Sequence, residues 1–158
     1  MDWLLAWIAA WPLAGWLRRS LYVYPFVNAA HLLGIALLVG AAVPADLRLL
    51  GCFKRFPVSE LVRYLTGWAA VGLGIAALTG ILLFTVKPQD YAGNPAFVAK
   101  IAFVLVGAAN ALTLRRTLDW RLMERGEPVS GRIRLGAAVS LACWLLALVA
   151  GRWIAFLE

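Results

Sequence analysis

Four long apolar stretches constrain the fold of this chain more than any other feature. Three of them, residues 29–45, 68–86 and 135–151, contain no Asp, Glu, Lys or Arg, and a fourth follows Lys100. A helix needs about 20 apolar residues to cross a bilayer. We therefore predict four membrane spans, at residues 22–44, 60–86, 95–115 and 132–156.

Length and composition lead to the same fold class. Of the 158 residues, 63% are hydrophobic and 15% are charged, whereas soluble domains average about 45–50% and about 25%. Four spans with short loops use most of the chain, so we expect a single membrane domain over residues 1–158. Short connections between successive spans favour an all-α, antiparallel four-helix bundle.

The segment before the first span is rich in tryptophan. Trp3, Trp7 and Trp11 recur every four residues and therefore share one helical face. Indole rings favour the boundary between membrane and water. We predict an interfacial helix within residues 1–19, ended by Pro12, with the two arginines that follow at the lipid headgroups. A fifth, tilted span is the alternative.

The positive charges are concentrated in two loops. Fifteen Lys and Arg against eight acids give a formal net charge of +7. Cytoplasmic loops of membrane proteins are enriched in Lys and Arg, so we expect both basic loops in the cytoplasm and both termini outside. Topology then accounts for the charge, and we predict no nucleic-acid binding. Ten of the fifteen lie in or beside the loops after the first and third spans: Arg48, Lys54, Arg55, Arg63, Arg115, Arg116, Arg121, Arg125, Arg132 and Arg134.

Small residues recur at helical spacing within the spans. Gly72, Ala76 and Gly80 form one stripe, and the first span offers the pairs Ala30 with Gly34 and Ala36 with Gly40. Such stripes let helix backbones approach closely in membranes. They indicate packing either between spans of one chain or between chains, so we also expect a homo-oligomer or a partner in a membrane complex.

His31, the only histidine, is the first candidate for a functional role. It lies about ten residues into the first span, roughly 15 Å along the helix, close to the middle of the membrane. Ionisable residues at such depth are costly and are usually functional. We predict a metal site in which His31 ligates the iron of b-haem, with Asn28 on the same face and Gly34 leaving room for the porphyrin. The alternative is a histidine that only forms a hydrogen bond with a neighbouring helix.

Two cations lie at the outer level of the predicted bundle. Lys100 is near the start of the third span and Arg152 near the end of the fourth. We expect them near the haem propionates, or near a quinone headgroup or an anionic lipid. The alternative is that both side chains extend to the headgroups. A second axial histidine is absent from the chain, so a sixth iron ligand would come from another subunit, come from a Tyr or Lys side chain, or be absent.

Other kinds of site receive less support from the sequence. No spacing of Cys, His or acids within a span suits zinc or copper held by one chain. Cys52 and Cys143 lie at different depths, so we predict no disulfide between them. Asp46 and Arg48 are interpreted as the C-terminal cap of the first span, with Gly51 allowing the chain to turn.

Two stretches of this sequence resemble a known family. The run YPFVNAAHLLGIALLVGAAVPADLRLLG and the ending GRWIAF are similar to an uncharacterised family of small bacterial inner-membrane proteins, a domain of unknown function. The resemblance implies a bacterial inner membrane, in which the termini that the charges place outside would be periplasmic. More loosely, the first span resembles copper-resistance protein D and four-helix b-type cytochromes, which implies that His31 is a haem ligand.

The sequence therefore supports three hypotheses for the function. The leading hypothesis is a small redox or electron-transfer membrane protein that binds b-haem through His31. The first alternative is a non-catalytic scaffold or accessory subunit, in which His31, Asn28 and Asn110 only connect helices. The second alternative is a protein that binds a quinone or a lipid in a pocket near Arg152.

Overall fold

The computed structural model describes residues 2–157 and contains, within them, helices and no strands. The predicted all-α membrane bundle is confirmed, because four of these helices are long and apolar enough to cross a membrane. They are α3 (Val23–Leu49), α4 (Val58–Val86), α6 (Pro95–Arg115) and α8 (Gly131–Trp153), the last followed by a 3-10 turn, η1 (Ile154–Phe156). The short helices are α1 (Asp2–Ala9), α2 (Pro12–Arg19), α5 (Pro88–Gly93) and α7 (Leu118–Glu124).

The outer surface of the long helices is apolar. Large side chains such as Leu33, Leu78, Leu105 and Leu135 are more than 60% exposed. A surface of this kind gains nothing from water but matches the acyl chains of a bilayer, where each backbone N–H and C=O must be satisfied within a helix.

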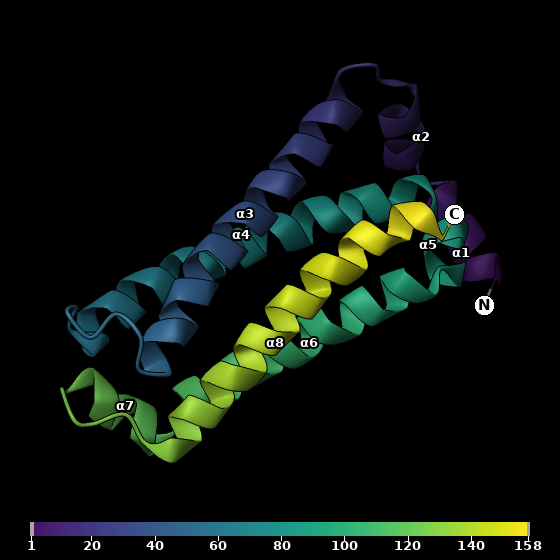
Figure 1. Ribbon diagram of the computed structural model, residues 1–158. Helices are drawn as coiled ribbons and strands as arrows, with labels where there is room; N and C mark the ends of the chain where they lie inside the picture. The colour runs from purple at the N-terminus through teal and green to yellow at the C-terminus, as the bar shows by residue number, and fades with distance from the viewer. Residues whose placement is uncertain (1, 158) are drawn as a thin grey trace.

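The long helices form two antiparallel hairpins. Helix α3 crosses α4, α6 lies beside α8, and contact between α3 and α8 joins the two pairs (Figure 1). The backbones of α4 and α6 do not approach each other in the part of the chain that the structure describes. Their aromatic side chains do meet at one end, where the rings of Phe84 and Phe97 stack with centroids 5.5 Å apart.

Glycines set the distance between α3 and α4. A Cβ built on Gly34 would lie 2.7 Å from the backbone nitrogen of Ala76, and one built on Gly72 would overlap the backbone of Leu38. Only the absence of side chains at these two positions permits such a close crossing. Gly34, Gly72 and Ala76 of the predicted stripes are therefore buried within one chain, whereas Ala36 and Gly40 are exposed.

Hydrogen bonds between helices fasten each hairpin. His31 Nδ1 on α3 donates to the carbonyl oxygen of Ala76 on α4 at 2.9 Å. Asn110 Nδ2 on α6 donates to the carbonyl oxygen of Gly136 on α8, also at 2.9 Å. Such bonds between membrane helices contribute about 0.6 kcal/mol on average, with a maximum of about 1.7 kcal/mol.

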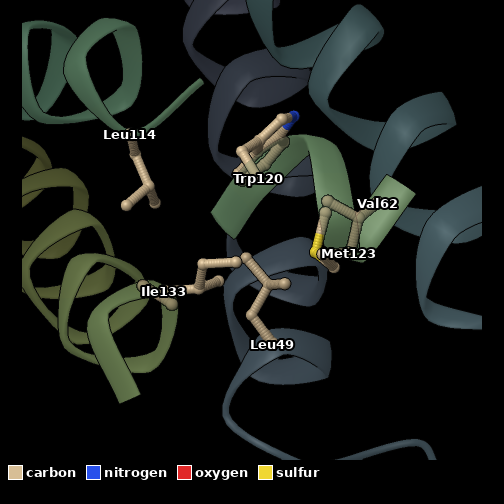
Figure 2. Close-up of a cluster of buried hydrophobic side chains, with 7 residues drawn as sticks. Leu49, Val62, Leu114, Trp120, Met123 and Ile133 are labelled. Carbon is tan, nitrogen blue, oxygen red and sulfur yellow. The ribbon is translucent and has the colours of Figure 1, made fainter. Parts of the chain in front are cut away.

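The two ends of the bundle differ in character. One end, called the basic end below, carries residues 50–57 and 116–130, and α7 lies across it (Figure 1). There Leu49, Met123 and Ile133 converge in a buried cluster from α3, α7 and α8 (Figure 2). Helices α1 and α5, and the C-terminus, lie at the opposite end.

Two predicted elements differ from the observed ones at a proline. Helix α3 continues through Pro44 to Leu49, five residues beyond the predicted end, and the chain then turns at Gly51 with φ +105°. The segment predicted as one interfacial helix ended by Pro12 is two helices, and Pro12 begins the second. Proline is favoured in the first turn of a helix because its missing N–H needs no partner there.

Two predicted loops contain short helices. Residues 88–93 form α5 and residues 118–124 form α7. Helix α7 is capped by Thr117, whose hydroxyl oxygen accepts from the backbone nitrogen of Trp120 at 3.3 Å. It is held further by Ser130, whose hydroxyl donates to the Asp119 carboxylate at 2.9 Å.

The crossing of α3 and α4 can be tested with a pair of glycine substitutions. We expect Gly72→Ala to lower the free energy of unfolding by about 1–3 kcal/mol, the usual cost of overpacking. Gly74→Ala on the same helix is the control, because no atom lies within 4 Å of a Cβ added there. Unfolding in detergent, followed by circular dichroism, measures both. Equal stability of the two variants would contradict the close crossing.

Candidate ligand-binding cavity and the His31 region

The ring of His31 is held in one orientation by α4. Its Nδ1 lies 2.9 Å from the Ala76 carbonyl oxygen and 3.1 Å from Thr79 Oγ1, while Thr79 itself donates to the Ile75 carbonyl at 2.6 Å. A carbonyl oxygen can only accept, so Nδ1 carries a hydrogen. In the neutral ring, Nε2 is then the unprotonated nitrogen.

The space that the sequence assigned to a porphyrin is filled by helix packing. Gly34 faces the backbone of Gly72 and Ala76, and a Cβ on Gly80 would lie 3.0 Å from Cε1 of His31. His31 is not among the residues that line the cavity described below. Gly34 and Gly80 thus provide contact with helix backbone and with the imidazole ring.

The other predicted site residues only partly gather around His31. Lys100 lies against Gly151, whose added Cβ would be 3.7 Å from Nζ, and it is close enough to His31 for an electrostatic interaction. Arg152 is exposed and places its guanidinium over the ring of Phe156 at 5.1 Å. Asn28 is exposed. The structure therefore brings Lys100 towards His31 and leaves Asn28 and Arg152 at the surface.

A cavity of about 180 Å³ lies in the other half of the bundle, towards the basic end. All four long helices contribute to its wall, together with Trp120 of α7. The wall includes the whole of one buried cluster, which consists of Leu38, Ala42 and Trp144. It also includes Leu49 and Leu114 from the cluster at the basic end. The wall is almost entirely apolar.

Asp46 of α3 is the acidic residue in this wall. The residue is only 7% exposed, and its Oδ2 atom is buried with no hydrogen-bond partner. The nearby Arg48 does not neutralise it, because Arg48 Nε donates to the Phe56 carbonyl at 2.9 Å. A buried polar atom without a partner is rare in proteins and calls for an explanation such as an unseen ligand.

Two residues of α8, Ser140 and Trp144, line the same cavity as Asp46. The Ser140 hydroxyl interacts with Asp46. Trp144 Nε1 donates to Ser140 Oγ at 3.0 Å. The Ser140 oxygen is thereby used as an acceptor, which leaves its hydrogen to donate to the carboxyl group.

The cavity is partly open, and its exposed wall residues lie on α4 and α6. They are Ala70 on α4, and Leu112 and Arg115 on α6. Since the backbones of these two helices stay apart, the opening lies between them and faces the acyl chains of a bilayer. Arg115 sits at this opening, with its guanidinium 6.0 Å from the centre of the Trp120 ring.

Sequence reasoning assigned Asp46 to a helix cap and missed its role in the cavity. A signal was present, because Leu38, Ala42 and Asp46 follow one another at four-residue spacing and share the buried face of α3. Ser140 and Trp144 show the same spacing on α8. What the sequence does not show is that these two faces meet.

The fold and the cavity define an all-α, multi-pass membrane protein with a polar group buried among its spans. The chain belongs to DUF6644, a family of unknown function, whose model matches residues 13–157. This confirms the resemblance to an uncharacterised family. Comparison with curated proteins and with solved structures gives no match. The looser resemblance to copper-resistance protein D and b-type cytochromes stays a prediction.

Proposed function

We propose that this protein binds a small, mostly apolar molecule of the quinone or lipid class in the cavity beside Asp46. The observation that carries the proposal is the buried Oδ2 atom of Asp46, a residue of this largely apolar wall. A ligand headgroup would supply the partner that the protein itself does not. The sequence led us to expect such a pocket near Arg152, and the cavity lies instead in the half of the bundle nearer the basic end.

The size and opening of the cavity support this class of ligand. A buried apolar cavity of about 150 Å³ is known to take up benzene, so about 180 Å³ accommodates a substituted ring or a short headgroup. An attached apolar tail would leave between α4 and α6, where Ala70 and Leu112 are exposed. Such a ligand reaches the site through the bilayer, without crossing water.

A b-haem electron-transfer protein is the second candidate. One observation favours it: the bond from Nδ1 to a backbone carbonyl is the arrangement that orients a metal-ligating histidine. His31 would hold the iron, and Lys100 would lie near the propionates. Because Gly34 packs against α4 and Gly80 packs against the His31 ring, this proposal calls for a second copy of the chain, or another subunit, to complete the site.

The accessory-subunit alternative rests on the same polar residues. His31 and Asn110 each make a hydrogen bond between helices, as this role requires. An accessory subunit would bind neither a haem nor a small apolar molecule, so the experiments below separate it from both other candidates.

We infer the orientation of the protein from its charges. Ten Lys and Arg lie at or near the basic end, which by the positive-inside rule faces the cytoplasm. In a bacterial inner membrane, both termini would then be periplasmic, and the cavity would lie in the cytoplasmic half of the bilayer.

The ligand proposal predicts that a larger side chain on the cavity wall abolishes binding. Ala111 lines the cavity and is half-buried, so we expect Ala111→Phe to reduce retention of decylubiquinone at least tenfold. Ala109→Phe is the control, since Ala109 lies at the same depth of α6 but is exposed outside the cavity. The quinone that stays with the protein after gel filtration is extracted and quantified by chromatography. Equal retention by the two variants would overturn the proposal.

The substitution His31→Ala distinguishes a haem ligand from a histidine that only forms a hydrogen bond between helices. Loss of its hydrogen bond should lower the free energy of unfolding by about 0.6–1.7 kcal/mol, whereas Asn28→Ala should leave stability unchanged. The haem proposal adds that the wild-type protein, purified from cells supplied with haem precursor, shows a Soret band that His31→Ala loses. A wild-type spectrum without this band would eliminate the haem proposal.

The orientation is tested with a native cysteine. Cys52 is an exposed free thiol at the basic end, while Cys143 is buried. We expect a membrane-impermeant maleimide to label the protein in inverted membrane vesicles and not in intact spheroplasts. Cys52→Ser should remove this labelling. Labelling of spheroplasts would reverse the inferred topology.

A further inference from the structure

We propose that the ligand of the Asp46 cavity carries a hydroxyl group on an apolar ring, as a hydroquinone does, and that this hydroxyl bonds to Asp46 Oδ2. This inference rests on the proposed function and narrows it to one chemical class. The juxtaposition that carries it is a buried carboxyl oxygen without a hydrogen-bond partner, on a residue that lines an apolar cavity of ring size.

The chemistry of the carboxyl group selects a hydroxyl over other headgroups. A hydroxyl donates to an ionised carboxylate and accepts from a protonated carboxylic acid, so it satisfies Oδ2 in both forms. The carbonyl of an oxidised quinone only accepts, and it leaves an ionised carboxylate without a partner. An unpaired buried charge of that kind is strongly unfavourable.

The charges around the cavity disfavour a cationic ligand. Arg115 lies at the opening, and the loops at that end carry most of the basic residues of the chain. An ammonium group entering there would meet like charge, whereas a neutral hydroxyl would not. The approach through the bilayer, between α4 and α6, likewise suits a neutral molecule.

Ser140 acts as a positioning residue for the carboxyl group. Its oxygen accepts from Trp144 Nε1 at 3.0 Å, and its hydroxyl interacts with Asp46. Oδ2 has no hydrogen-bond partner and is the atom that we assign to the ligand. Fixing the acceptor before binding reduces the entropy that binding must overcome.

A second acceptor is present on another wall of the cavity. Asn110 on α6 uses its amide nitrogen to bond to Gly136, and its amide oxygen makes no hydrogen bond within the described residues. Asp46 and Asn110 thus line the cavity from different helices, each with a free acceptor. A ring with hydroxyl groups at both ends matches this pair better than a simple phenol does.

The test compares three probes of similar shape: decylubiquinol, decylubiquinone, and the dimethyl ether of the quinol, which has no hydroxyl hydrogen. Equilibrium binding is measured under anaerobic conditions at pH 8, with the full chain in nanodiscs. We expect the wild-type protein to bind the quinol about tenfold more tightly than either other probe, as one hydrogen bond to a charged acceptor allows.

Variants then assign the preference to Asp46. An amide offers both a donor and an acceptor, so Asp46→Asn should bind the quinol and the quinone within about threefold of each other. Ser140→Ala keeps the carboxyl group but frees its orientation, and we expect it to reduce the preference for the quinol over the quinone. If Asp46→Asn does not fold, Ser140→Ala and the dimethyl ether probe still test whether a ligand hydroxyl bonds to Asp46.

The outcomes separate this inference from the proposed function. If the wild-type protein binds none of the three probes, the proposed function itself fails. If it binds all three equally, the cavity binds rings of this kind but the assignment of a hydroxyl to Asp46 is overturned. A preference for the quinol that survives Asp46→Asn would also overturn the assignment.

Discussion

The close crossing of α3 and α4 is the contact on which the rest of the structure depends. In a bilayer, helices gain little from burying apolar surface against one another, and van der Waals contact between small residues takes its place. Gly34 and Gly72 supply that contact here. The crossing brings His31 to the carbonyl of Ala76. It also fixes the course of α3 towards α8, where Asp46 meets Ser140.

The cavity is a consequence of how the two hairpins are joined. The hairpins meet through α3 and α8, while the backbones of α4 and α6 stay apart. A gap at that position would normally be filled by larger side chains, but its wall includes Ala69, Ala70 and Ala111. Helix α7 adds Trp120 and Met123 to the cluster at the basic end. The cavity is therefore bounded on the side of the basic loops and open towards the bilayer.

The sequence predicts the spans better than it predicts the site, for a physical reason. Hydropathy reports the solvent of a segment, so α4, α6 and α8 begin and end within a few residues of the expected positions. The contact between helices depends on which faces meet, and one chain does not encode that in any local period. His31 attracted attention because it is the only histidine, yet its role in the fold is a bond to Ala76. Asp46, close to a helix end, resembled a cap.

Three ionisable side chains lie within the apolar part of the bundle, and their surroundings separate their roles. His31 has Ala76 and Thr79 as partners, and Lys100 lies along the small residue Gly151. For these two, the surrounding helices account for the position. Asp46 is the most buried of the three and keeps an oxygen without a partner. Burying a carboxyl group in a membrane is costly, and an apolar residue at this position would pack without that cost. A ligand that bonds to Oδ2 supplies the missing compensation, so the function is sought at Asp46 before His31.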